Sequence, residues 1–78
     1  MGPKVVEVEP KDNYKLQAVF SNGERREFDV SPYLDKGIFS ELRDPNYFRT
    51  VRVVAGSVEW PREQDFSFDT VYLAGVPC

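Results

Sequence analysis

The sequence of 78 residues has no histidine, a single cysteine and no long apolar run. Histidine is the commonest general base and a usual zinc ligand, so its absence removes every Ser-His or Cys-His nucleophile. The one cysteine, Cys78, cannot pair within its own chain, which excludes a disulfide-framed secreted scaffold. No apolar run approaches the roughly 20 residues of a membrane-spanning helix, and the first residues do not resemble a signal peptide. We expect a cytoplasmic protein that does not enter a membrane.

Signatures of phosphate and metal binding are also missing. The glycines Gly23, Gly37 and Gly56 are isolated at expected turns and form no phosphate-binding loop. The acidic residues near the C-terminus lack the spacing of a calcium-binding loop. These residues are Glu59, Glu63, Asp65 and Asp69. We expect a chain that is not an enzyme and has no cofactor, catalytic residue or metal site, with the acidic residues forming a solvated face.

The composition predicts one small folded domain, residues 1–78. Hydrophobic residues make up 41% of the chain and aromatic residues 14%. Each aromatic ring can bury roughly 150–250 Å², so these rings suffice for a small core. The formal net charge is −3, and the acidic excess lies in residues 55–78. Proteins that bind nucleic acids usually carry the opposite charge, so nucleic acid is an unfavoured partner for this chain alone.

Residues 14–30 predict a β-hairpin, because apolar and polar residues alternate on both sides of the turn signal Ser21-Asn22-Gly23. A two-residue Asn-Gly turn would place Leu16 opposite Asp29 and join an apolar face to a charged one. A three-residue loop places Leu16 opposite Phe28 instead, with its glycine as the left-handed residue of a bulge. We predict the three-residue loop.

The pattern then changes to a helical period. Ser31-Pro32 is typical of a helix start, with Ser31 as the N-cap. Apolar residues at a spacing of four predict one buried helical face. These residues are Leu34, Ile38 and Leu42, with Phe39 alongside. We expect Gly37 to split the segment into pieces at 32–36 and 38–43. Asp44-Pro45 repeats the start signal and predicts another short turn to Arg49.

A second hairpin is predicted for residues 51–60, with Val53 opposite Val58 and Val51 opposite Trp60. We predict a four-residue loop, 54–57, because it spares Ala55 a positive φ angle.

Pro61 ends that hairpin. The stretch Asp69–Leu73 then predicts a short helical turn capped by Ser67, with a last edge strand as the alternative. The expected fold is α+β, in the order β-β-β-α-β-β with a short final helical turn. Its sheet is mostly antiparallel, built from two hairpins packed on short helices.

Several of these short patterns, spread from about Val5 to Gly75, resemble a bacterial family known as domain of unknown function 2442. The loop after Trp60-Pro61 departs from the family, which usually has an Asn/Gly-type turn where this chain has Arg62-Glu63-Gln64. The residues that carry the resemblance are Phe20-x-Asn22-Gly23, Phe28-Asp29-Val30, Leu42-x-Asp44-Pro45-x-x-Phe48, Trp60-Pro61-x-x-x-Asp65 and Asp69-Thr70-x-Tyr72-Leu73.

The resemblance implies a compact α+β protein that is often encoded beside another small protein, as in toxin–antitoxin pairs. It also implies relatives fused to a C-terminal helix-turn-helix, and it supplies no catalytic or ligand-binding residues.

Two functional hypotheses follow. The first is a non-catalytic protein-interaction or regulatory module, antitoxin-like, whose partner is a small protein encoded nearby or a second copy of the chain. Aromatic residues and arginines dominate interface energetics, so the expected contact residues are Tyr47, Phe48 and Trp60, with Arg49 and Arg52 at the rim. The alternative is a nucleic-acid-associated accessory domain of a transcription regulator.

Overall fold

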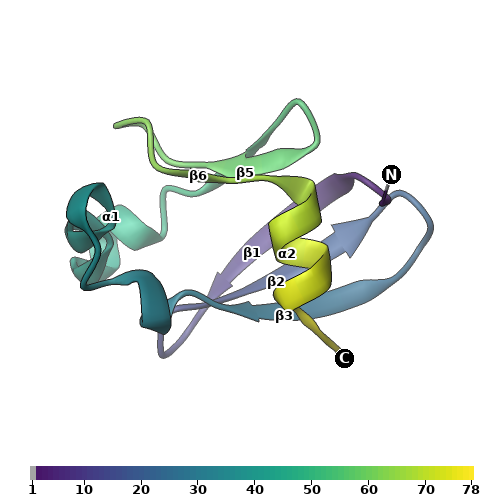
Figure 1. The fold of residues 1–78 in the computed structure, drawn as a ribbon, viewed down its shortest axis with the longest axis horizontal. Helices are drawn as coiled ribbons and strands as arrows, with labels where there is room; N and C mark the ends of the chain where they lie inside the picture. Colours follow the sequence, from purple (N-terminus) through teal and green to yellow (C-terminus); the bar gives the residue numbers. More distant parts are fainter. Residues whose placement is uncertain (1) are drawn as a thin grey trace.

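The computed structural model describes residues 2–78 (Figure 1). Residues 2–78 form seven strands, two 3₁₀ helices labelled η, and two short α-helices. In order these are β1 (Val5–Lys11), β2 (Lys15–Phe20), β3 (Arg25–Asp29), η1 (Ser31–Tyr33), η2 (Gly37–Arg43), α1 (Pro45–Phe48), β4 (Arg52–Val54), β5 (Ser57–Glu59), β6 (Asp65–Phe66), α2 (Phe68–Ala74) and β7 (Val76–Pro77).

The strands form two antiparallel sheets, ordered β1-β2-β3-β7 and β4-β5-β6. In Figure 1 the three-stranded sheet lies above the four-stranded one, the segments from η1 to α1 close one end, and α2 runs between the sheets near the other. The predicted α+β class is confirmed. The two hairpins belong to separate sheets, and the two-residue strands β6 and β7 were not predicted.

The first hairpin has the predicted register. Leu16 lies opposite Phe28, and both side chains are buried. Gly23 has a φ angle of 88°, as expected for the left-handed residue of a three-residue loop. Burial of the apolar face therefore selected this register over the two-residue Asn-Gly turn.

The second hairpin has the predicted register but not the predicted turn. Val53 pairs with Val58, while Val54 pairs with Ser57 and leaves a two-residue turn. Its residues Ala55 and Gly56 have φ angles of 51° and 83°. The prediction of a four-residue loop, made to avoid a positive φ angle at Ala55, was wrong. A two-residue turn with positive φ angles matches the right-handed twist of the strands.

The segment after β3 splits at Gly37, as predicted, with a φ angle of 43°. Both pieces are 3₁₀ rather than α-helical, so side chains three apart share a face. Phe39 and Leu42 accordingly pack into the core, while Ile38 is 59% exposed. The prediction that Ile38 lies on the buried face was wrong because it assumed the α-helical period.

The three predicted helix starts have different outcomes. Ser31 is not an N-cap, because its backbone N–H and its hydroxyl both donate to Asp29 Oδ1. Asp44 caps α1 by accepting from Asn46 N, 2.9 Å away. Ser67 caps α2 by accepting from Thr70 N, and the predicted helical turn is confirmed.

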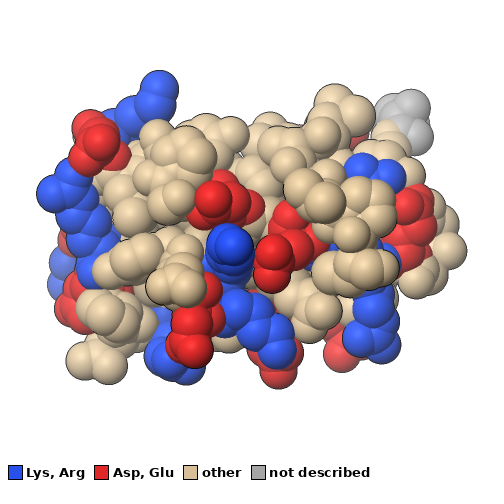
Figure 2. Space-filling model, turned by 90° about the horizontal axis from the view of Figure 1, so that it is seen from below, with Lys and Arg blue, Asp and Glu red and all other residues tan. Residues whose placement is uncertain are grey.

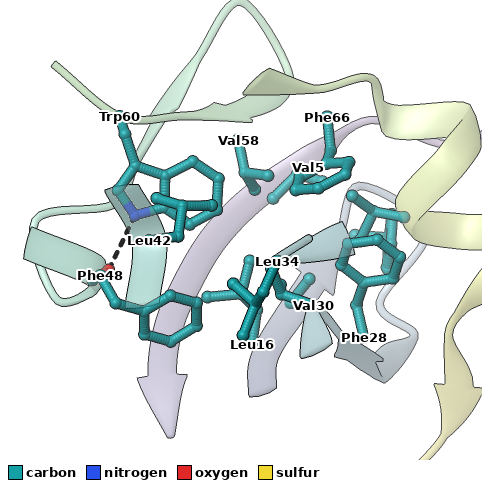
Figure 3. Packing of buried hydrophobic residues seen from close by; sticks show 13 residues of the cluster. Val5, Leu16, Phe28, Val30, Leu34, Leu42, Phe48, Val58, Trp60 and Phe66 are labelled. Carbon is teal, nitrogen blue, oxygen red and sulfur yellow. Dashed lines mark hydrogen bonds between the residues drawn. The ribbon is translucent and has the colours of Figure 1, made fainter. Parts of the chain in front are cut away.

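The core lies between the two sheets and contains most of the large apolar side chains (Figure 3). Trp60 is fully buried, and its indole Nε1 donates to the Phe48 carbonyl at 2.8 Å. Phe66, from the two-residue strand β6, reaches Phe28 on the other sheet, two rings of the helical segment, and Trp60 just after β5. The buried apolar residues are Val5, Leu16, Ala18, Phe20, Phe28, Val30, Leu34, Leu42, Phe48, Val58, Trp60, Phe66 and Val71.

The chain turns from α2 into β7 at Gly75, where it passes very close to β3. A Cβ atom at this position would lie 2.5 Å from the Val71 carbonyl oxygen and 3.1 Å from Arg26 Cβ. Contacts this short are not tolerated, so only glycine fits here without backbone movement.

We expect Gly75→Ala to lower the free energy of unfolding by about 1–3 kcal/mol, because the added methyl group meets backbone atoms that cannot move aside. Urea unfolding followed by circular dichroism measures the change. The control is Leu73→Ala at a position that is 80% exposed, where we expect a change within about 0.5 kcal/mol. Equal effects of the two substitutions would contradict the close-packing argument.

We expect Ala55→Asn to raise the free energy of unfolding by about 0.5 kcal/mol, because asparagine adopts the left-handed conformation with less strain than alanine. The same urea titration checks it. A loss of stability would show that the strain at Ala55 does not govern this turn.

Candidate functional site

The five expected contact residues do not form one surface. Phe48 is 3% exposed and Trp60 is fully buried, so both belong to the core. Tyr47 is half-buried. The side chains of Arg49 and Arg52 are 61% and 60% exposed, and Arg52 lies 3.4 Å from Glu59 on the neighbouring strand. Only Arg49 and part of Tyr47 remain near α1 as accessible groups.

A hollow of about 450 Å³ lies between the β1–β2 turn and α1. We call it the α1 hollow. It brings together residues more than thirty positions apart in the sequence. They are Lys11, Asp12, Asn13, Tyr14, Pro45, Phe48 and Arg49.

One wall is a strained turn. Asn13 and Tyr14 have φ angles of 63° and 60°, the left-handed region that residues other than glycine rarely adopt. Contacts hold Tyr14 there: its carbonyl accepts from Val30 N at 2.9 Å, and its ring meets Phe48 edge-on at 5.4 Å. Its hydroxyl donates to the Arg43 carbonyl. Backbone strain of this kind clusters at functional sites, and here the core maintains it.

The other wall is the single turn of α1. Pro45 occupies the first turn, where its missing N–H costs nothing. Arg49 caps the end of this helix, and its N–H donates to the Pro45 carbonyl at 3.1 Å. This geometry places the guanidinium at the rim, 3.6 Å from Asp12 of the opposite wall. Because both side chains are mostly exposed, this ion pair contributes little stability and can exchange partners.

A buried polar network next to α1 serves the fold. Gln64 is fully buried, its Nε2 donates to the Ile38 carbonyl at 2.9 Å and to Glu41 at 3.0 Å, and its Oε1 accepts from Tyr47 Oη at 2.6 Å. The Glu41 carboxylate also accepts from Arg62 and raises the pKa of that guanidinium. All the polar atoms of the Gln64 amide group therefore have partners, and the network joins η2 to the loop between β5 and β6.

A second polar cluster fixes α2 against β3. The Arg26 guanidinium lies 3.8 Å from the centre of the Tyr72 ring, and it donates to the Tyr72 carbonyl at 2.7 Å and to Glu24 at 3.0 Å. Glu24 also accepts from the Tyr72 hydroxyl and from Asn22. These hydrogen bonds, that of Tyr72 first, then Asn22 and Arg26, lower the pKa of Glu24.

Within residues 2–78, no group of three or more acidic or thiol side chains is placed to hold a metal ion. None of the helices described is long and apolar enough to cross a membrane.

Comparison with known families matches residues 5–77 to the family described as Protein of unknown function (DUF2442). The chain belongs to this family. The match covers nearly the whole sequence, and the resemblance noted from its short motifs is confirmed. No curated protein and no solved structure matches the chain. Membership in DUF2442 therefore identifies a domain without assigning its activity.

Sequence reasoning missed five residues that line the α1 hollow of this DUF2442 chain: Lys11, Asp12, Asn13, Tyr14 and Pro45. Tyr14 was expected within a strand and Pro45 only as the start of a turn. The signal that was present is Asp12-Asn13, a turn-forming pair between two alternating segments.

The lowered pKa of Glu24 predicts a pH-dependent contribution to stability. Because the folded-state pKa lies below that of the unfolded chain, near 4.3 in ordinary carboxyls, the stabilisation is complete above that value. It is lost as the pH falls through the lowered folded-state pKa. We expect Glu24→Gln to destabilise the protein at about pH 7 and to approach the wild type as the pH is lowered below the folded-state pKa of Glu24, as measured by urea unfolding.

Tyr72→Phe removes the hydrogen bond that lowers the pKa of Glu24 most. It should therefore reduce the same pH dependence while keeping the aromatic packing. A stability difference between wild type and Glu24→Gln that stays constant over this pH range would refute the assignment.

Proposed function

We propose that this DUF2442 chain is a non-catalytic protein-interaction module that holds a small partner protein on the α1 hollow. The observation that carries the proposal is the combination of the Tyr14 and Phe48 rings in the lining, a strained turn and one exposed arginine in that hollow. Aromatic and arginine side chains next to a depression are typical of the few residues that dominate binding energy.

The exposed ion pair between Asp12 and Arg49 at the rim supports a partner that competes for Arg49. The Asp12 side chain that faces it is 91% exposed and 3.6 Å away. A carboxylate on a partner can replace Asp12 at little cost. The attraction between that carboxylate and Arg49 becomes stronger if the partner excludes water from the pair. The positive φ angles of Asn13 and Tyr14 hold that wall in one shape, which reduces the entropy lost on binding.

The polar groups favour binding over chemistry. The Tyr14 hydroxyl is already bound to the Arg43 carbonyl. The Glu41–Gln64 and Glu24–Arg26 clusters are bonded within the chain and lie outside the hollow lining. A general acid or base must reach a reacting atom, and the carboxylate in the lining, Asp12, is solvated at the rim.

The proposed partner is a small protein encoded next to this chain, and the proposed role is regulatory in the manner of an antitoxin. The test is to co-express the two proteins and measure the mass of the product by size-exclusion chromatography with light scattering. We expect a complex, and we expect Arg49→Glu to weaken it by at least about tenfold, since an attraction at the rim becomes a repulsion.

Lys36→Glu is the matched control, because it makes the same change of charge at an exposed residue outside the hollow. Two independent monomers for the wild type, or equal affinities of the Arg49 variant and the wild type, would contradict the proposal. Binding of duplex DNA that weakens steeply with salt would instead support the accessory nucleic-acid domain.

A further inference from the structure

The outer face of the four-stranded sheet is open. In Figure 1 the three-stranded sheet and most of the helical segments lie on its upper side. Figure 2 views the molecule from below and shows acidic and basic side chains interspersed on that surface. Alternation along the strands sends Leu16, Ala18 and Phe20 into the core. The residues between them face outward.

Strand pairing arranges three of the outward residues in one row. Glu7 of β1 lies beside Val19 of β2, and Val19 lies beside Arg25 of β3. The row therefore reads acid, apolar, base across the sheet. A hollow of about 300 Å³ is centred on these strands, and all three residues line it.

Glu7 and Arg25 differ in their ion pairing from the charged residues of the next row, Glu9 and Glu27. Glu9 lies 2.5 Å from Lys11, and Glu27 lies 3.9 Å from Lys15, so these charges are paired within the chain. Among residues 2–78, neither Glu7 nor Arg25 belongs to an ion pair within 4 Å. Both charges are therefore available to a second molecule.

We propose that a second copy of the chain covers this face, related by a twofold axis that runs parallel to the strands between the two sheets. Such an axis exchanges the β1 and β3 sides, so Glu7 of each copy lies over Arg25 of the other, and Val19 meets its own equivalent. This is a self-complementary interface of the kind that closed dimers use, and it aligns the sheets as in a β-sandwich.

The other outward rows agree with this axis. Lys11, Lys15 and Asp29 occupy one row, so the exchange places Lys11 of each copy over Asp29 of the other. Glu9 and Glu27 would also meet across the interface, and each carries a lysine of its own chain that offsets the repulsion. A twofold axis perpendicular to the strands would also bring opposite charges together, Glu7 over Lys11 and Arg25 over Asp29. It would, however, place the apolar Val19 over Lys15 instead of over its own equivalent.

This surface and its occupant differ from those of the proposed function, so either proposal can fail without the other. The test uses the chain alone in sedimentation equilibrium at concentrations up to about 1 mM. We expect a dimer that dissociates as salt is raised from about 0.05 M to about 0.5 M, because exposed ion pairs are screened. Glu7→Lys and Arg25→Glu should each weaken it at least about tenfold, since a twofold axis turns each reversal into two repulsions.

The double variant, Glu7→Lys with Arg25→Glu, restores opposite charges under this axis and should recover the wild-type dissociation constant to within about threefold. The control Asp35→Lys makes the same charge change as Glu7→Lys at a side chain that is 87% exposed in the connection between η1 and η2, and it should leave dimerisation unchanged. A monomer at every concentration, or a double variant as weak as the single ones, would overturn the proposal.

Discussion

The packing of Phe66 between the two sheets is the contact on which the rest of the fold depends. Its ring lies 5.0 Å from Phe28 of β3, 4.9 Å from Tyr33 of η1, 4.8 Å from Phe39 of η2 and 6.0 Å from the Trp60 ring. One side chain thus joins both sheets and both 3₁₀ helices. A chain of this length has a thin core, and edge-to-face aromatic contacts strengthen it beyond the area they bury. The orientation of α1, and with it the α1 hollow, follows from this cluster through the adjacent pair Phe48 and Trp60.

Hairpin registers could be predicted from the sequence because they follow from local alternation together with one rule, that apolar faces must coincide. Leu16 opposite Phe28 and Val53 opposite Val58 are both of this kind. The same rule does not determine the turn. Ala55 has a positive φ angle, although alanine disfavours that conformation. Nor does it distinguish a 3₁₀ from an α-helix, which is why Ile38 was placed on the wrong face.

The α1 hollow was beyond sequence reasoning for a different reason. Its two walls, residues 11–14 and 45–49, meet only because Tyr14 packs on Phe48 and donates to the Arg43 carbonyl. Both contacts are long-range, and no local pattern encodes them. Gln64 gives a second example, since nothing in Arg62-Glu63-Gln64 indicates that its last residue is fully buried. Phe48 and Trp60 show a complementary difficulty, because a ring that fills a core and a ring that meets a partner look alike in a sequence.

The tight turn at Ala55 and Gly56 also bears on how the molecule opens. The carbonyl of Gly56 accepts from Val5 N at 2.8 Å, so the tip of the small sheet is bonded to the first residue of β1 in the large one. This hydrogen bond crosses between sheets that otherwise adhere through side chains. Separating the sheets breaks it, whereas fraying within either sheet need not. The exchange of the Val5 amide hydrogen therefore reports the free energy of sheet separation, and it distinguishes a protein that opens between its sheets from one that unfolds in a single cooperative step.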